Sequence, residues 1–232
     1  MVAMNDAHAT PERMTLARHG AERFDAAARH ILTPLEELFA QHPPAAAGTR
    51  LFDSAPLRDL LGGDGPIGTL ARRLLGDRAR PVRAILFDKS LDANWGLGWH
   101  QDRVIAVRGR ADIAGYGPWS VKRGIDHVAP PWPVLNEMRT LRVHLDPVGP
   151  DNAPLLISPG SHRLGFIAEP EIDATVARLG IRACLAAAGD VWAYATLILH
   201  ASAASQSAAR RRVLQLDYAA ADLPSGIDWF GL

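Results

Sequence analysis

A histidine and a carboxylate stand two residues apart near the middle of the chain, in the segment Trp99-His100-Gln101-Asp102. In an extended segment the side chains at positions i and i+2 point to the same side, so His100 and Asp102 can meet at one point. With a second histidine they would form a two-His-one-carboxylate face, which suits non-haem Fe(II) and leaves coordination positions open. The chain also contains His144-Leu145-Asp146, so the spacing alone does not choose between the two pairs.

The second histidine can come from a strand far along the chain. We predict a strand over 190–199 that ends at His200, which would place this imidazole at the mouth of a sheet. The run Arg210-Arg211-Arg212 begins the next predicted strand, where a guanidinium could bind a carboxylate through two parallel hydrogen bonds. One end of a barrel could therefore hold two histidines, a carboxylate and an arginine.

Strand alternation leaves the choice among these arginines open. Arg211 shares a face with Val213, and Arg212 shares a face with Leu214. If the leucines line the barrel, Arg212 points inward instead of Arg211.

The elements that must position these residues change in type near residue 81. Residues 1–80 are predicted to be a helical layer, with apolar residues at helical intervals over 15–39. Between 167 and 185, the Ala and Glu content predicts either one helix or an irregular excursion. Short strands separated by Gly, Pro and Asn clusters follow residue 80, at 82–87, 104–107, 140–145, 155–157, 190–199 and 212–218.

This order of elements predicts a mostly β protein with supporting helices. The strands would form an antiparallel barrel or a double-sheet jelly roll over 81–220, with the N-terminal helical layer packed on it. With 232 residues, the chain is expected to be a single domain spanning 1–232.

Composition excludes several classes of protein. Twenty-five basic and 25 acidic residues cancel, which argues against non-specific binding of nucleic acid or of anionic membranes. No stretch approaches the ~20 apolar residues of a membrane helix, and the start lacks a signal peptide pattern, so we expect a cytoplasmic protein. Cys184 is the only cysteine, which excludes a disulfide framework or a cysteine zinc site. The zero net charge leaves the oligomeric state open.

Several segments together resemble the phytanoyl-CoA dioxygenase (PhyH) family of Fe(II)/2-oxoglutarate oxygenases. The resemblance covers roughly residues 83–220 in the family's order, and joint occurrence is far more specific than any single motif. The segments are Gly98-Trp99-His100-Gln101-Asp102, Leu141-Arg142-Val143-His144-Leu145-Asp146, Asn152-Ala153-Pro154-Leu155, Ser158-Pro159-Gly160-Ser161-His162, Gly189-Asp190-Val191 and His200-Ala201-Ser202.

The resemblance implies a double-stranded β-helix (a jelly-roll, cupin-like barrel) with iron bound by His100, Asp102 and His200. It also implies that an arginine eleven residues after the second histidine, here Arg211, pairs with the far carboxylate of 2-oxoglutarate. Ser202 matches a position that touches the same carboxylate. The family's Asn-Gly-Pro-Leu turn has Ala153 in place of glycine here, and alanine tolerates a positive φ less well.

Other residues are expected near the site from their place in the sequence. Asn94 and Lys89, just before the motif, could hydrogen-bond the cosubstrate. Contacts with substrate are assigned to Trp119, Lys122 and His127 in a Gly/Pro-rich insertion, and to Arg142 and His144, which share one face of a strand.

The function that follows is an Fe(II)- and 2-oxoglutarate-dependent dioxygenase. It would use O2 to hydroxylate a small organic substrate, releasing succinate and CO2. Two alternatives remain at this level. One is a catalytically inactive barrel that binds a metal or a small molecule. The other is a cupin-like enzyme that uses another divalent metal without 2-oxoglutarate.

Overall fold

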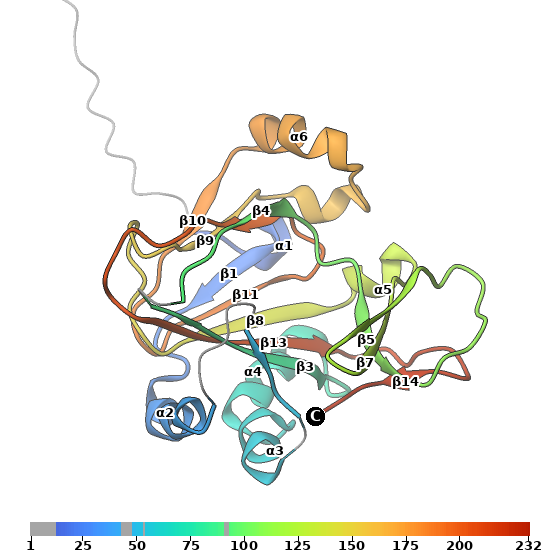
Figure 1. The fold of residues 1–232 in the computed structure, drawn as a ribbon, viewed down its shortest axis with the longest axis horizontal. Helices are drawn as coiled ribbons and strands as arrows, with labels where there is room; N and C mark the ends of the chain where they lie inside the picture. The colour runs from blue at the N-terminus through green and yellow to red at the C-terminus, as the bar shows by residue number, and fades with distance from the viewer. Residues whose placement is uncertain (1–12, 43–47, 53, 91–92) are drawn as a thin grey trace, which may run out of the picture.

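Two antiparallel sheets face each other in this computed structural model, which describes residues 13–42, 48–52, 54–90 and 93–232 (Figure 1). The larger sheet has the strand order β1-β11-β8-β13-β3-β2, and the smaller has the order β10-β9-β12-β4. The larger sheet consists of β1 (Ala21–Phe24), β11 (Val191–Ala195), β8 (Arg139–His144), β13 (Arg211–Ala219), β3 (Arg80–Lys89) and β2 (Thr49–Arg50). The smaller sheet consists of β10 (Arg182–Cys184), β9 (Leu155–Ile157), β12 (His200–Ser202) and β4 (Leu97–His100).

The outer face of the larger sheet is covered by three helices, as the lower half of Figure 1 shows. These are α2 (Leu32–Ala40), α3 (Ala55–Leu61) and α4 (Pro66–Leu75). A proline in the first turn and a glycine at the C-cap bound both α3 and α4. Their leucines pack against Leu141, Val143, Leu214 and Leu216 of the sheet in one apolar cluster.

Because successive side chains of a strand point to opposite faces, the residues between these apolar positions face the smaller sheet. Because Leu141 and Val143 of β8 point to the helices, Arg142 and His144 point into the barrel. On β13 the leucines likewise face the helices, so Arg211 lies on the inner side. The inner apolar cluster joins the sheets through Leu155 and Ile157 of β9 and Trp192 and Tyr194 of β11.

A third sheet lies at one end of the barrel, on the right of Figure 1. It contains β14 (Asp228–Trp229), β5 (Ile105–Arg108), β7 (Ile125–Val128) and β6 (Trp119–Lys122). The helix α5 (Trp132–Asn136) follows it, and α6 (Ile172–Leu179) lies over the smaller sheet. The Gly/Pro-rich insertion that contains Trp119, Lys122 and His127 thus includes a β-hairpin, β6–β7.

The predicted mostly β fold with a double-stranded β-helix core is confirmed, but two local predictions are wrong. The helical layer over 1–80 is interrupted, because β1 pairs with β11 and β2 pairs with β3 at the two edges of the larger sheet. The single strand over 190–199 is two strands. β11 ends at Ala195, and His200 begins β12 in the smaller sheet.

The remaining short helices are α1 (Leu16–His19) and three 3₁₀ turns at Arg29–Ile31, Ser161–Leu164 and Glu169–Glu171. Within the described ranges, no helix has the length and apolar character needed to cross a bilayer.

Candidate metal and cosubstrate site

His100, Asp102 and His200 come together inside the barrel mouth, as the sequence predicted. One ligand atom from each lies within 4.8 Å of the others. His100 ends β4 and His200 begins β12, and these two residues are directly paired across the strands, with ring centroids 4.2 Å apart. Asp102 follows two residues after β4 ends, so its carboxylate reaches the same point from a loop. Such a set of donors can hold a divalent transition metal.

Both histidine rings are oriented by a backbone carbonyl. Nδ1 of His100 lies 2.7 Å from the carbonyl oxygen of Gly98, and Nδ1 of His200 lies 2.9 Å from that of Ile198. Because a carbonyl only accepts, each ring carries its proton on Nδ1 and leaves the lone pair of Nε2 free for a metal. Burial lowers the pKa of His200 to about 4, so its ring is neutral at neutral pH.

Gln101, between the two ligands of the motif, fixes the backbone that carries them. Its buried side chain donates to the carbonyls of Gly165 and Leu197 and accepts from the amide of Ile167. These bonds tie the metal-binding segment to two other loops, which preorganises His100 and Asp102.

Asp102 is held by an arginine from the larger sheet. Arg83 on β3 donates to one carboxylate oxygen of Asp102 at 3.1 Å and, through Nε, to Asp217 on β13. Burial raises the pKa of Asp102, but Arg83 and the two histidines outweigh it and keep the pKa below its usual value. The carboxylate is therefore ionised, as a metal ligand must be.

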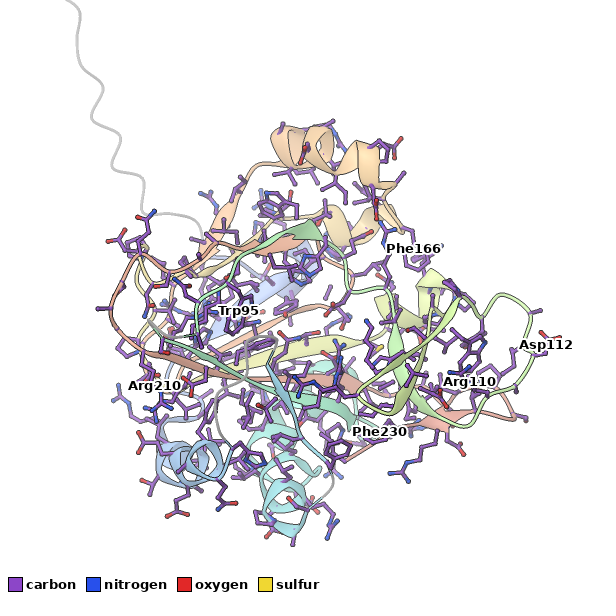
Figure 2. The ribbon with its side chains drawn as sticks, viewed as in Figure 1. Trp95, Arg110, Asp112, Phe166, Arg210 and Phe230 are labelled. Carbon is purple, nitrogen blue, oxygen red and sulfur yellow. The ribbon has the colours of Figure 1, made fainter. Side chains whose placement is uncertain are left out.

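A cavity of about 440 Å³ opens in front of these residues. Its walls are apolar at Ile85, Phe87, Trp95 and Leu155, and Trp95 projects between the two sheets (Figure 2). The polar residues of its wall are predominantly cationic: Arg50, Arg83, Lys89, Lys122, Arg142 and Arg211.

One end of the cavity has the properties of a carboxylate-binding site. Arg211 and Lys89 are directly paired across β13 and β3, and both are almost fully buried. Arg211 donates to the carbonyl of Ala153, while its Nε has no partner among the described residues. Lys89 donates to the carbonyls of Trp95 and Ala203 and lies 3.3 Å from the hydroxyl of Ser202.

Among the described residues, neither cation at this end has an acidic partner. Burial, followed by the charge of Arg142, lowers the pKa of Arg211 to about 9, so it stays charged at neutral pH. Burial, followed by the charges of Arg211 and Arg142, lowers the pKa of Lys89 to about 7. A bound dianion would relieve this repulsion.

The neighbouring arginines are occupied on the outside of the sheet. Arg212 forms a two-pronged ion pair with Asp146, and Arg210 forms one with Asp88. Figure 2 shows Arg210 at the outer edge of the barrel, on the left of the view. Of the three candidates, Arg211 alone lines the cavity.

Four of the other predicted residues lie outside the cavity wall. Asn94 exchanges two hydrogen bonds with the backbone of Ser205 and so closes a loop, contrary to its expected contact with the cosubstrate. Trp119 packs in the apolar cluster of the third sheet, with Arg110 over its ring. His127 and His144 are fully or almost fully buried behind the wall.

Lys122 and Arg142 do line the cavity. Arg142 donates to the side chain of Gln215 at 2.6 Å, and its guanidinium lies 5.3 Å from the centre of the Phe87 ring. Sequence reasoning missed Arg83, Arg50 and Gln215. Strand alternation is the one signal that could have found two of them. Arg83 lies on the same face of β3 as Lys89, and Gln215 lies on the same face of β13 as Arg211.

A barrel of two facing antiparallel sheets, with a His-Asp-His cluster at its mouth, is typical of cupin-like metal-dependent enzymes. The family model described as phytanoyl-CoA dioxygenase (PhyH) matches residues 67–213, and the chain belongs to this family. Membership confirms the predicted enzyme class, a non-haem iron oxygenase that depends on 2-oxoglutarate.

Solved structures agree with the fold. EctD from S. alaskensis with bound Fe is 20% identical, with a TM-score of 0.64 over 94% of this chain and 78% of that one. AviO1 from Streptomyces viridochromogenes Tue57 is 19% identical, with a TM-score of 0.59 over 91% and 94% of the two chains. HygX from Streptomyces hygroscopicus, with nickel, 2-oxoglutarate and hygromycin B bound, is 12% identical, with a TM-score of 0.56 over 88% and 84%. A search of curated proteins gave no match.

Proposed function

We propose that this protein hydroxylates a small organic substrate, using Fe(II), 2-oxoglutarate and O2 and releasing succinate and CO2. One observation carries the proposal. The His100-Asp102-His200 cluster and the buried Arg211-Lys89 pair line the same cavity, so a metal-binding site and a carboxylate-binding site lie side by side.

In this proposal His100, Asp102 and His200 bind the iron. Their donor atoms fit the ion, because both Nε2 atoms are free and one Asp102 oxygen has no bond to Arg83. When bound, the iron and 2-oxoglutarate supply the oxidising chemistry, and the protein supplies position and environment.

Arg211 binds the far carboxylate of 2-oxoglutarate, and Ser202 and Lys89 contact the same group. Arg211 is well suited to this because the carbonyl of Ala153 fixes the guanidinium, and no carboxylate among the described residues neutralises its charge. The apolar side chains Phe87 and Leu155 exclude water from the region between the cosubstrate and the substrate. Lys122 and Arg142 remain our candidates for contacts with bound organic molecules.

We further propose that the whole chain acts as one oxygenase domain. β1 extends the larger sheet and β14 extends the third sheet, and both of these sheets contribute residues to the cavity wall, which supports this proposal. A cytoplasmic location is also a proposal, supported by the single buried cysteine.

The test is an anaerobic titration of metal-free protein with Fe(II) and 2-oxoglutarate. Bidentate chelation produces a weak visible charge-transfer band, which we expect in the wild type and not in His100→Ala. The matched control is His30→Ala, an exposed histidine outside the site. Normal iron binding without a band would contradict the proposal, as would failure to form succinate from 2-oxoglutarate in air.

A further inference from the structure

Two cations of the cavity wall, Arg50 and Lys122, bind neither the metal nor 2-oxoglutarate in the proposed function. Arg50 lies on the edge strand β2, directly opposite Ile85 of β3, so its side chain leaves the sheet on the side where Ile85 lines the cavity. Lys122 ends β6 in the third sheet and is exposed to solvent. Two separate sheets thus present positive charge to one opening.

Neither cation has an acidic partner in the part of the chain that the structure describes. Nη1 of Arg50 is buried and makes no hydrogen bond there. Among the described residues of the cavity wall, Asp102 is the only carboxylate, and Arg83 already binds it. A buried, charged nitrogen without a partner is costly, which points to a ligand that supplies one.

The pKa directions agree with this geometry. Burial lowers the pKa of Arg50, and the charges of Arg83 and Arg123 lower it further. Burial also lowers the pKa of Lys122, with Arg50 and Arg83 as the next contributors. An anion placed between Arg50 and Lys122 would attract both side chains and so offset the repulsion between them.

The cosubstrate cannot be this anion. Lys89, at the carboxylate-binding end, is four residues along β3 from Ile85, which corresponds to roughly 13 Å at the usual rise of a strand. One carboxylate of 2-oxoglutarate would be at Arg211 and the other at the metal. Both carboxylates of 2-oxoglutarate therefore have partners elsewhere in the cavity, and neither is left to bind Arg50 and Lys122.

We propose that Arg50 and Lys122 bind an oxyanion of the substrate, a carboxylate or a phosphate group, and that the substrate is therefore a small organic anion. An arginine can bind either group through two parallel hydrogen bonds, and a lysine adds a point charge. The cavity of about 440 Å³ is at the small end of the range for ligand sites and also has to hold the cosubstrate, so the reacting part of the substrate is small. This inference depends on the proposed function for its assignment of the other end of the cavity.

The test is calorimetric titration of the protein, loaded anaerobically with Fe(II) and saturating 2-oxoglutarate, in low-chloride buffer. The probes are acetate and hexanoate as carboxylates, inorganic phosphate and hexyl phosphate as phosphates, and hexanamide as the neutral control. We expect at least one anion to bind about tenfold more tightly than hexanamide. Arg50→Gln and Lys122→Gln should each weaken that binding about tenfold, equivalent to about 1.4 kcal/mol. Arg73→Gln, an exposed cation on α4, should leave it unchanged.

The outcomes separate the two proposals. A preference for the carboxylates or for the phosphates identifies the chemistry of the substrate's anionic group. The proposal of an anionic substrate would be overturned if the anions bind no better than hexanamide, or if Arg50→Gln and Lys122→Gln bind them as tightly as the wild type does. In either case, an intact charge-transfer band would leave the oxygenase assignment standing. If the charge-transfer band fails to form, the proposed function fails, and the same anions are titrated into the wild type and Arg50→Gln without 2-oxoglutarate. Weaker binding to Arg50→Gln would then support the anion site on its own, and equal binding would overturn it.

Discussion

The guanidinium of Arg83 donates a hydrogen bond of 3.1 Å to the carboxylate of Asp102, and the same group is bound to Asp217. Asp217 is in turn held by the hydroxyl of Thr140 at 2.9 Å. A loop residue that we assign to the metal is thus anchored to two central strands of the larger sheet. The sheet therefore positions Asp102 in addition to the bonds by which Gln101 anchors the loop.

Replacing Arg83 should therefore weaken metal binding without touching a ligand. We expect Arg83→Gln to raise the Kd for Fe(II) by about 10–100-fold, the usual effect of losing a partner that orients a ligand. It should also lower the free energy of unfolding by about 3–5 kcal/mol, because the buried carboxylate of Asp217 and the partly buried one of Asp102 lose their counter-charge. Iron titration under folding conditions measures the first effect, and urea unfolding measures the second.

Arg80→Gln is the matched control for this prediction. Arg80 lies on the same strand and binds the exposed carboxylate of Asp222, where solvent screens the ion pair. Arg83→Lys, which keeps the charge, should have an iron affinity and a free energy of unfolding between those of the wild type and Arg83→Gln. Unchanged iron affinity in Arg83→Gln would show that Asp102 is positioned by its loop alone.

The adjacent Arg211 and Arg212 offer a sharp test of the cosubstrate site. Arg211 lines the cavity, whereas Arg212 points outward to Asp146 and Glu36. We expect Arg211→Gln to weaken 2-oxoglutarate binding by about 10–100-fold, since a hydrogen bond between charged groups contributes about 1.5–3 kcal/mol. Arg212→Gln should lower stability and leave this affinity unchanged. The charge-transfer band measures the 2-oxoglutarate affinity of both variants. Equal losses of affinity in the two variants would refute the assignment of Arg211 to the cosubstrate carboxylate.

Lys89 should make cosubstrate binding depend on pH. With a pKa of about 7 in the ligand-free protein, Lys89 loses its proton as the pH rises above neutrality. A bound dianion favours the charged form, so the pKa rises and binding takes up a proton. The affinity for 2-oxoglutarate should thus fall as the pH rises from 7 to 8, by at most about tenfold per unit.

Calorimetry in buffers of different ionisation enthalpy measures this proton uptake directly. We expect the uptake at pH 8 to disappear in Lys89→Met, which keeps an unbranched side chain and removes the titrating group. In Lys122→Met, a lysine on the other side of the cavity, the uptake should persist. Persistence of the uptake in Lys89→Met would assign the titration to another group.

The sequence was informative about the strands but not about which face of each strand lies inside. Both faces of the larger sheet are buried, one under α2, α3 and α4 and the other against the smaller sheet. Leu214 and Leu216 could therefore have lined either side. Alternation alone does not distinguish an inward Arg211 from an inward Arg212 when both faces are covered.

The change of sheet before His200 could not be read from periodicity either. The residues 197–199 are apolar and fully buried, so they continue the pattern of β11 although the chain turns there. Short edge strands such as β1 and β2 also carry weak signals, because two to four residues cannot establish a period. The resemblance to the PhyH family nevertheless identified the three clustered residues, because it depends on motifs and their order along the chain, which these local errors leave unchanged.

The turn that holds Arg211 contains a residue under backbone strain. Ala153 has a φ of +46°, in the left-handed region that glycine adopts readily, and its carbonyl accepts hydrogen bonds from Arg211 and Ser202. The alanine that replaces the family's glycine therefore keeps the turn geometry. A β-branched side chain should not, because it is far less tolerant of positive φ and this site is buried.

We expect Ala153→Val to lower the free energy of unfolding by about 2 kcal/mol through strain and overpacking. It should also weaken 2-oxoglutarate binding, because the carbonyl that fixes Arg211 is displaced, while iron affinity is retained. Ala168→Val, an exposed alanine with a φ of −59°, should change stability by less than about 0.5 kcal/mol. Urea unfolding and the charge-transfer titration measure the two effects. If Ala153→Val loses stability but keeps its cosubstrate affinity, the carbonyl of residue 153 supports only the fold, and Arg211 is positioned by β13 alone.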